Sequence, residues 1–175
     1  VLIFYIIYRN RKQNEALLKS AQTDGLTGIY NKRSTEERIN EIRDENPAEK
    51  GTFVILDVDK FKEVNDRYGH MAGDKVLSEF GRILKAHFRE EDVVGRIGGD
   101  EFVALCRGME EGELYREVEE LRAELDREHV TMAVGAAVNT LGAVGFDHLL
   151  TEPERRMYQD KAEDYRKSGL NRRRQ

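Results

Sequence analysis

The order of secondary-structure signals predicts an α+β fold, a ferredoxin-like βαββαβ sheet covered by helices mainly on one face. Two continuous apolar runs rich in β-branched residues, 52–58 and 130–138, are typical of buried strands. Two shorter apolar runs, 93–97 and 102–106, flank a glycine pair and an acidic pair, which is typical of a β-hairpin. Between these runs, apolar residues recur at helical spacing.

Size and composition favour one globular domain with an appendage. The chain has 175 residues, with a hydrophobic fraction of 39% and a charged fraction of 36%. The net charge of −5 argues against a general nucleic-acid-binding surface. Cys106 is the single cysteine and lies in an apolar run. We expect it to be a reduced core residue of a cytoplasmic protein, with no disulfide and no thiolate metal site.

The N-terminal segment has the character of a membrane-proximal element. Residues 1–8 are apolar throughout, and Arg9, Arg11 and Lys12 follow at once. Spanning a bilayer takes about 20 residues, so we expect 1–8 to be the end of a transmembrane helix, with the basic cluster on the cytoplasmic side. The alternative is a buried N-terminal strand. Residues 9–22 are expected to form a connector helix suited to pairing with its copy in a dimer.

Capping residues set the expected helix starts. Ser34 is expected to cap one helix, with Glu37 three residues on completing a capping box. Thr151 with Glu154 repeats this pattern, and Pro153 then falls in the first turn of the last helix. The expected elements are, in order, helix 34–43, strand 52–58, helix 61–68, a helix from near Asp74 to Phe88, the hairpin, helix 111–127, strand 130–138 and a helix from Thr151.

Four carboxylates fall where the chain is expected to turn. Asp57 and Asp59 alternate at the end of a strand and therefore share one face of it. Asp100 and Glu101 lie at the hairpin tip. Carboxylates at a strand end beside others at a hairpin tip suit Mg²⁺, and two such ions can activate a hydroxyl and stabilise a leaving phosphate. The candidate set is Asp57, Asp100 and Glu101, whereas Asp59 is favoured as an N-cap over direct ligation.

The glycine pair and three polar residues complete the candidate site. Gly98 and Gly99 are expected to supply positive φ and to let a triphosphate approach the backbone, although an isolated turn of this kind is often only solubilising. Lys62 and Asn65 share a helix face, where the lysine suits a phosphate and the asparagine a base edge. Asp74 could accept from a guanine-type N–H pair or serve as an N-cap. Alone, Lys62 and Asn65 are typical of a solvated surface.

Three motifs agree in type and in chain order with those of the GGDEF family of diguanylate cyclases, and the resemblance covers about residues 23–171. The hairpin motif resembles the signature that gives the family its name, and the other two are similar to its N-terminal motif and to its first strand with the metal and guanine sites. The motifs are Gly98-Gly99-Asp100-Glu101-Phe102, then Asp24-Gly25-Leu26-Thr27 with Asn31 and Arg33, and Asp57 to Asp66 with Tyr68-Gly69-His70 and Gly73-Asp74.

The resemblance implies a fold like the palm of nucleotide polymerases and class III nucleotide cyclases. It implies the reaction 2 GTP → cyclic di-GMP + 2 pyrophosphate, carried out across the two-fold axis of a homodimer in which each domain binds one GTP. It also implies that Asp100 or Glu101 helps to deprotonate the attacking 3′-hydroxyl. The metal, Mg²⁺ or Mn²⁺, would be bound by Asp57, the carbonyl of Val58, Asp100 and Glu101.

The remaining site residues also follow from the resemblance. Asn65 and Asp74 would hold the guanine, Lys62 and Lys161 would contact the phosphates, and the turn at Gly98 and Gly99 would cradle them.

A second site is implied by Arg89 and Asp92, which are three residues apart just before the hairpin. In the family, an Arg-x-x-Asp at this offset forms the product-inhibition site, where arginine stacks on guanine and binds phosphate and aspartate takes the guanine edge. The alternative is an ordinary surface salt bridge, which contributes little.

One part of the chain departs from the family pattern. Members commonly close with Gly-Arg-Asn shortly after the phosphate-binding lysine, whereas the triplet after Lys161 is Gly169-Leu170-Asn171. The phosphate-binding arginine of the triplet is absent in place, and Arg166 and Arg172 are the candidates to substitute for it.

The resulting prediction is an enzyme of bacterial second-messenger signalling at the cytoplasmic face of the inner membrane. The expected segments are a membrane helix end at 1–8, a connector at 9–22, a catalytic domain at 23–171 and a basic tail at 172–175. The alternative is a non-catalytic receptor for cyclic di-GMP or GTP. Retention of the three candidate metal-binding carboxylates favours the enzyme, and a ligand-free interaction domain leaves the motifs unexplained.

Overall fold

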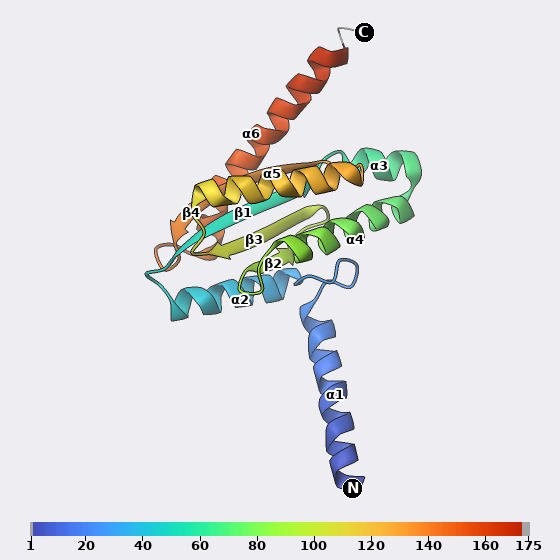
Figure 1. Ribbon diagram of the computed structural model, residues 1–175, viewed down its shortest axis with the longest axis vertical. Helices are drawn as coiled ribbons and strands as arrows, with labels where there is room; N and C mark the ends of the chain where they lie inside the picture. Colours follow the sequence, from blue (N-terminus) through green and yellow to red (C-terminus); the bar gives the residue numbers. More distant parts are fainter. Residues whose placement is uncertain (1, 173–175) are drawn as a thin grey trace.

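The computed structural model describes residues 2–172 and has a four-stranded sheet at its centre (Figure 1). The strand order is β2-β3-β1-β4, and every neighbouring pair is antiparallel. With the helices between the strands, this is the expected βαββαβ order, so the α+β prediction is confirmed. The strands are β1 (Lys50–Val58), β2 (Val93–Arg96), β3 (Glu101–Arg107) and β4 (Met132–Thr140).

Helices cover both faces of the sheet, so the expectation of coverage mainly on one face was wrong. Val54 and Leu56 of β1 pack in a core with α4 and α5, while Phe53 and Ile55 pack in a second core with α2 and α6. Because every residue of β1 after Lys50 is buried, each face needs its own cover. The helices are α1 (Leu2–Gln22), α2 (Lys32–Glu45), α3 (Phe61–Tyr68), α4 (His70–His87), α5 (Glu111–Arg127) and α6 (Phe146–Arg172).

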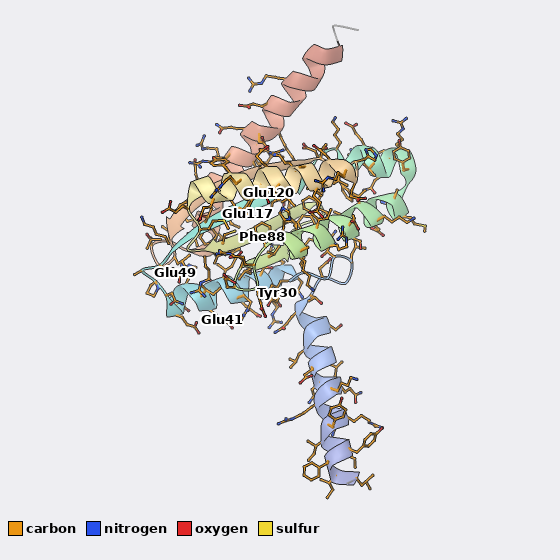
Figure 2. All side chains as sticks on the ribbon, in the orientation of Figure 1. Tyr30, Glu41, Glu49, Phe88, Glu117 and Glu120 are labelled. Atoms are coloured by element: carbon orange, nitrogen blue, oxygen red, sulfur yellow. The ribbon has the colours of Figure 1, made fainter. Side chains whose placement is uncertain are left out.

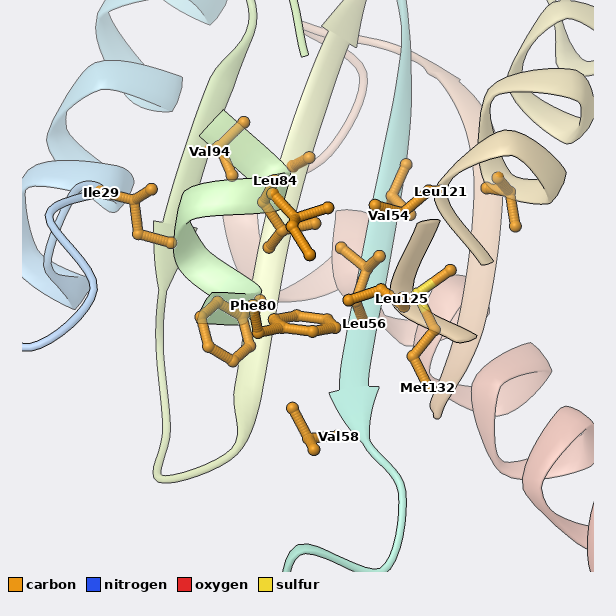
Figure 3. Packing of buried hydrophobic residues seen from close by; sticks show 14 of the residues in the cluster. Ile29, Val54, Leu56, Val58, Phe80, Leu84, Val94, Leu121, Leu125 and Met132 are labelled. Carbon is orange, nitrogen blue, oxygen red and sulfur yellow. The ribbon is translucent and has the colours of Figure 1, made fainter. Parts of the chain in front are cut away.

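The core under α4 and α5 fixes the position of the hairpin relative to β1. Figure 3 shows Phe80 from α4 and Leu125 from α5 against Leu56 of β1. The rings of Phe80 and Phe102 lie 4.7 Å apart, so the first apolar residue after the hairpin tip is anchored beneath α4. This packing holds the start of β3 beside the end of β1.

The predicted caps at Ser34 and Thr151 were wrong. Helix α2 begins two residues before Ser34, because the side chain of Asn31 accepts a hydrogen bond from Ser34 N at 2.9 Å and takes the cap position. Helix α6 begins five residues before Thr151, so Pro153 lies inside the helix. A methyl group at Gly135 of β4 would lie 1.9 Å from Pro153 O. This close packing on β4 offsets the helical hydrogen bond that proline cannot make.

The caps predicted for Asp59 and Asp74 were also wrong. The residue before α3 is Lys60, with φ of 55°, and no side chain caps that helix. Gly69, with φ of 84°, separates α3 from α4, so α4 begins at His70 and Asp74 lies within its second turn. The N-cap positions of α3 and α4 are therefore Lys60 and Gly69, not Asp59 and Asp74.

Helix α1 extends away from the sheet, as does the C-terminal part of α6 in the opposite direction (Figure 1). Residues 2–8 are helical and exposed, so the alternative of a buried N-terminal strand was wrong. Among residues 2–172, no helix combines the length and apolar character needed to cross a membrane. Val1 and the tail residues 173–175 lie outside the described residues.

Candidate active site

The register of the sheet brings the predicted carboxylates together. Asp57 lies directly opposite Glu101 in the antiparallel β1–β3 ladder, so their side chains share one face. The backbone N–H of Val58 donates to Asp100 O at 3.1 Å, which fixes the hairpin tip to the end of β1. Asp57 also has the same orientation as Phe53 and Ile55, toward α2 and α6.

Asp57 is the buried centre of this group. It is 4% exposed, and Lys161 Nζ from α6 lies 2.7 Å from its Oδ1. The contact is an ion pair without hydrogen-bond alignment, because Oδ1 is buried and has no hydrogen-bond partner. Burial raises the pKa of the Asp57 carboxyl to about 6, with Lys161 opposing the rise and the charges of Asp100 and Glu101 adding to it. Partial burial lowers the pKa of Lys161, but the Asp57 carboxylate outweighs it and the pKa is raised.

These residues fit a divalent cation. Asp57 is paired with Lys161, the charges of Asp100 and Glu101 act on the same carboxylate, and its pKa is raised. Hard oxygen ligands with excess negative charge are what Mg²⁺ prefers. The oxygens of Asp57, Asp100 and Glu101 do not all lie within 4.8 Å of one another, so a shared ion requires them to move inward. Lys161 provides the counter-charge in their present arrangement.

The glycine pair keeps the hairpin tip bare. Neither Gly98 nor Gly99 has positive φ, so the expectation of left-handed backbone here was wrong. The turn closes instead through Ile97 N and Gly98 N, which donate to Glu101 O at 3.0 and 3.2 Å. A methyl group at Gly99 would meet nothing within 4 Å, and one at Gly98 would lie 2.8 Å from Glu101 Oε2. The glycines are therefore needed for space, because a side chain would cover the tip or displace Glu101.

Arg96 connects the hairpin tip to the N-terminal turn, a role that sequence reasoning missed. Its Nε and Nη2 donate to Gly99 O at 3.1 and 2.6 Å, while Nη1 lies 3.1 Å from Asp24 Oδ1. Asp24 also accepts from Thr27 N at 2.9 Å and Thr27 Oγ1 at 2.7 Å. Burial raises the pKa of Asp24, but the bonds from Thr27 and Arg96 outweigh it and lower the pKa. The available signal was an arginine two residues before the glycine pair.

Tyr30 and Asn31 complete this connection to α1. Tyr30 adds to the edge strand β2, with Tyr30 N donating to Val94 O at 3.2 Å and Arg96 N donating to Tyr30 O at 2.9 Å. Asn31 Nδ2 donates to Ala21 O in the last turn of α1 at 2.8 Å. The end of α1, the N-terminal turn and the hairpin therefore form one hydrogen-bonded unit.

The residues expected to hold a base meet between α3 and α4. A methyl group at Gly73 would lie 2.0 Å from Asn65 Oδ1, so glycine lets Asn65 pack directly on α4, one residue from Asp74. Asn65 Oδ1 is buried without a hydrogen-bond partner, and Asp74 is exposed. Buried acceptors are normally satisfied, so an unpaired one at this position is unusual. Lys62 is exposed on α3, at the same end of the sheet.

Arg89 and Asp92 form a bidentate ion pair with a buried carboxylate, which is more than a surface salt bridge. Asp92 has a fully buried side chain and accepts from Arg89 Nε and Nη2 at 3.1 and 3.0 Å. It also accepts from the backbone N–H groups of Arg89 at 3.0 Å and Arg107 at 3.2 Å. Arg89 is 43% exposed and lines a cavity of about 550 Å³ between the N-terminal turn and residues 88–92. Arg89 is thus accessible to a ligand, whereas Asp92 is saturated with donors.

A family model described as diguanylate cyclase, GGDEF domain, matches residues 21–167. The chain belongs to the GGDEF domain family. The chain is 37% identical over 101 residues to the diguanylate cyclase DgcS of Shewanella oneidensis, covering 57% of this chain and 34% of DgcS. It is 34% identical over 140 residues to the diguanylate cyclase TpbB of Pseudomonas aeruginosa, covering 78% of this chain and 32% of TpbB. It thus spans about a third of these curated relatives.

Solved GGDEF structures have the same fold. The diguanylate cyclase SiaD of Pseudomonas aeruginosa, in complex with its activator SiaC, matches with a TM-score of 0.77 at 27% identity, over 93% of this chain and 66% of SiaD. The coiled coil and GGDEF domain of DgcB from Caulobacter crescentus, in complex with c-di-GMP, matches with a TM-score of 0.82 at 21% identity, over 91% of both chains. The match to DgcB is evidence for the fold of this GGDEF domain and for no other property.

The C-terminal departure of this GGDEF domain from the family pattern lies on α6. Residues 169–172 continue this helix beyond the sheet (Figure 1). Arg166 is exposed and donates from Nε to Ala162 O at 3.3 Å, within its own helix. The side chain of Arg172 lies outside the described side chains. Arg166 thus does not contact Lys161 or Asp57 in this arrangement, and its proposed substitution for the missing arginine requires a change of rotamer.

Proposed function

We propose that this GGDEF domain is a diguanylate cyclase that condenses two GTP into cyclic di-GMP and releases two pyrophosphates. The observation that carries the proposal is the buried carboxylate of Asp57, which lies opposite Glu101 in the ladder and has a pKa raised by burial and by the neighbouring carboxylates. A carboxylate of this kind lowers the stability of the fold, and a role in binding a cation explains why it is present. Asp100 at the hairpin tip and Lys161 on α6 complete the charged cluster.

Asp57, the carbonyl of Val58, Asp100 and Glu101 would hold Mg²⁺, or Mn²⁺ in its place. When bound, the ion supplies charge to stabilise the phosphates and the attacking oxygen. Lys161, which is paired with Asp57 in this structure, would contact the phosphates, as would Lys62 from α3. Asp100 or Glu101 accepts the proton of the 3′-hydroxyl. The bare tip at Gly98 and Gly99 lets a triphosphate approach the backbone.

The active species would be a homodimer, because each domain binds one GTP and the two hydroxyls attack across a two-fold axis. Helix α1 supports this, since Leu17 and Leu18 are 62% and 61% exposed and a second copy could cover these apolar side chains. Residues 2–8 expose a further apolar surface just before Arg9 and Arg11. We infer that this part of α1 meets the cytoplasmic face of a bacterial inner membrane.

The proposal is tested by incubating the purified protein with GTP and Mg²⁺ and identifying products by chromatography and mass spectrometry. We expect cyclic di-GMP and two pyrophosphates for each molecule of it. Binding of GTP or cyclic di-GMP without any product would instead indicate a non-catalytic receptor.

The choice of base provides a prediction for Asn65 and Asp74. Asn65→Ala and Asp74→Ala should each reduce the preference for GTP over ATP, because a lost base-reading hydrogen bond costs about 1–3 kcal/mol. The measurement is the ratio of kcat/KM for the two nucleotides. Ser78→Ala, at an exposed position of α4, the helix that also carries Asp74, is the matched control. Unchanged selectivity in both variants would refute the guanine assignment.

Feedback control provides a prediction for Arg89. We propose that cyclic di-GMP binds at Arg89 and Asp92 and holds two hairpins apart, which is inhibition through a separate site. Because Asp92 already has four donors, Arg89 must first release it for the aspartate to take the guanine edge. Arg89→Ala should lower the affinity for cyclic di-GMP at least about tenfold, or about 1.4 kcal/mol.

Titration of cyclic di-GMP into the wild type and Arg89→Ala measures this effect directly. Progress curves of Arg89→Ala should also stay linear for longer, because accumulating cyclic di-GMP no longer inhibits the variant. Arg82→Ala removes an exposed arginine of α4 that pairs with Glu79, and it should leave the affinity unchanged. Equal affinity in the wild type and Arg89→Ala would assign Arg89 and Asp92 a structural role alone.

A further inference from the structure

A group of potential metal ligands lies between α4 and α5, apart from the candidate active site. His87 ends α4, and Glu117 and Glu120 lie one turn apart on α5. One ligand atom from each of the three residues lies within 4.8 Å of the other two. Figure 2 shows Glu117 and Glu120 together on α5, near Phe88, which follows His87. Of the residues that the structure describes, this is the group that meets that distance.

The imidazole of His87 has the surroundings of a metal ligand. The side chain is 17% exposed, and its Nε2 atom is buried without a hydrogen-bond partner. Buried ring nitrogens are normally paired, so an unpaired one requires an explanation. On the other side of the ring, Nδ1 lies 3.5 Å from Glu124 Oε2, one further turn along α5. A carboxylate beside one ring nitrogen is the usual arrangement when the other nitrogen binds a metal.

We propose that His87, Glu117 and Glu120 bind a divalent transition-metal ion of the Zn²⁺ type, which fastens the end of α4 to α5. One imidazole and two carboxylates suit Zn²⁺ and similar ions better than Mg²⁺, which prefers oxygen ligands alone. Ligand atoms around a tetrahedral Zn²⁺ are about 3.4 Å apart, so the group must contract by up to about 1.4 Å. Glu120 is exposed and Glu117 is half-buried, which leaves both side chains free to turn inward.

This site is independent of the proposed catalytic function. Helices α4 and α5 cover the face of the sheet opposite to the one on which Asp57 lies. The two sites also differ in ligand type, because the catalytic cluster is composed of carboxylates and a lysine. Mg²⁺ in excess would therefore occupy the carboxylate cluster and leave the imidazole site to Zn²⁺.

The test is a titration of the metal-stripped 175-residue protein with Zn²⁺ in excess Mg²⁺, followed by calorimetry and by ¹⁵N NMR of the histidine side chains. We expect one equivalent to bind and only the Nε2 resonance of His87 to shift among the four histidines. His87→Gln and Glu120→Gln should each weaken Zn²⁺ binding at least about 100-fold, and Glu124→Gln about 10–100-fold.

Two matched controls separate this site from general surface binding. His148→Gln on α6 and Glu119→Gln on α5 change exposed residues outside the group and should leave the Zn²⁺ affinity unchanged. Because Glu120 is exposed, its variant should fold even if His87→Gln does not. The proposal fails if Zn²⁺ does not bind, if the His87 resonance does not move, or if Glu120→Gln binds like the wild type.

Discussion

Asp57→Asn is expected to reduce cyclic di-GMP formation at least about a thousandfold and, in the absence of divalent cations, to raise the melting temperature at pH 7. The substitution keeps the shape of the side chain and removes its charge. Catalysis is lost because the charged cluster can no longer hold a cation against the phosphates. Stability rises because the fold no longer has to bury a carboxylate that is 4% exposed.

The pH dependence of this gain follows from the raised pKa of Asp57. The pKa of the Asp57 carboxyl is 3.8 ordinarily and about 6 in the folded protein. At a pH between these two values, the folded carboxyl retains a proton that the unfolded one has lost. The unfolded state then binds fewer protons, so the free energy of unfolding falls as the pH rises through this window. Above pH 6, the charged Asp57 lowers the free energy of unfolding by up to about 3 kcal/mol. Asp57→Asn regains only part of this free energy, because the variant also loses the ion pair with Lys161.

Thermal melts of the wild type and Asp57→Asn from pH 4 to pH 8, with parallel activity assays, measure both effects. The two melting temperatures should converge toward pH 4 and separate above pH 6. Asp44→Asn, at an exposed position of α2, should match the wild type throughout. An Asp57→Asn variant that retains near-normal Mg²⁺-dependent turnover would overturn the assignment of Asp57 to the cation.

Glu101→Gln is expected to reduce product formation by a similar factor, with a smaller gain in stability because the charge of Glu101 is only a minor cause of the raised pKa of Asp57. Glu101 lies opposite Asp57 but is only partly buried at the start of β3, so its charge is solvated in the folded state. Activity falls because glutamine neither accepts the proton of the 3′-hydroxyl nor contributes charge to the cation.

Initial rates and melting temperatures of Glu101→Gln distinguish a chemical role from a structural one. Glu154→Gln, which removes an exposed acid from α6, is the matched control. Turnover within tenfold of the wild type would show that Glu101 is dispensable. A large loss of stability would indicate instead that Glu101 supports the hairpin through its contact with Gly98.

Sequence patterns predicted the sheet well because its signals are long and depend on burial. The runs that form β1 and β4 are apolar at nearly every position, and the hairpin follows from its glycine and acidic pairs. The meeting of Asp57 with the hairpin tip followed from placing each at the end of a strand. Coverage of both faces was missed even though the continuous apolar run from Phe53 to Leu56 in β1 already carried that signal.

Local caps and long-range contacts were harder to predict because several residues compete for each role. Asn31 caps α2 in place of Ser34, since both residue types are favoured at N-cap positions and the sequence offers both within four residues. Arg96 and Lys161 find Asp24 and Asp57 only once the fold is formed, at separations of 72 and 104 residues. Periodicity describes neighbours along one element and carries no information about such pairs.

If this GGDEF domain forms cyclic di-GMP from GTP with Asp57 at the metal site, its rate of product formation should depend on both the protein concentration and the Asp57 carboxylate. Initial rates of cyclic di-GMP formation are recorded with GTP and Mg²⁺ over a wide range of protein concentrations, for the wild type and Asp57→Asn together. We expect product from the wild type, with a rate per molecule that rises with concentration as dimers form, and almost none from Asp57→Asn. Absence of wild-type product at every concentration, or equal rates from the two proteins, would contradict this expectation.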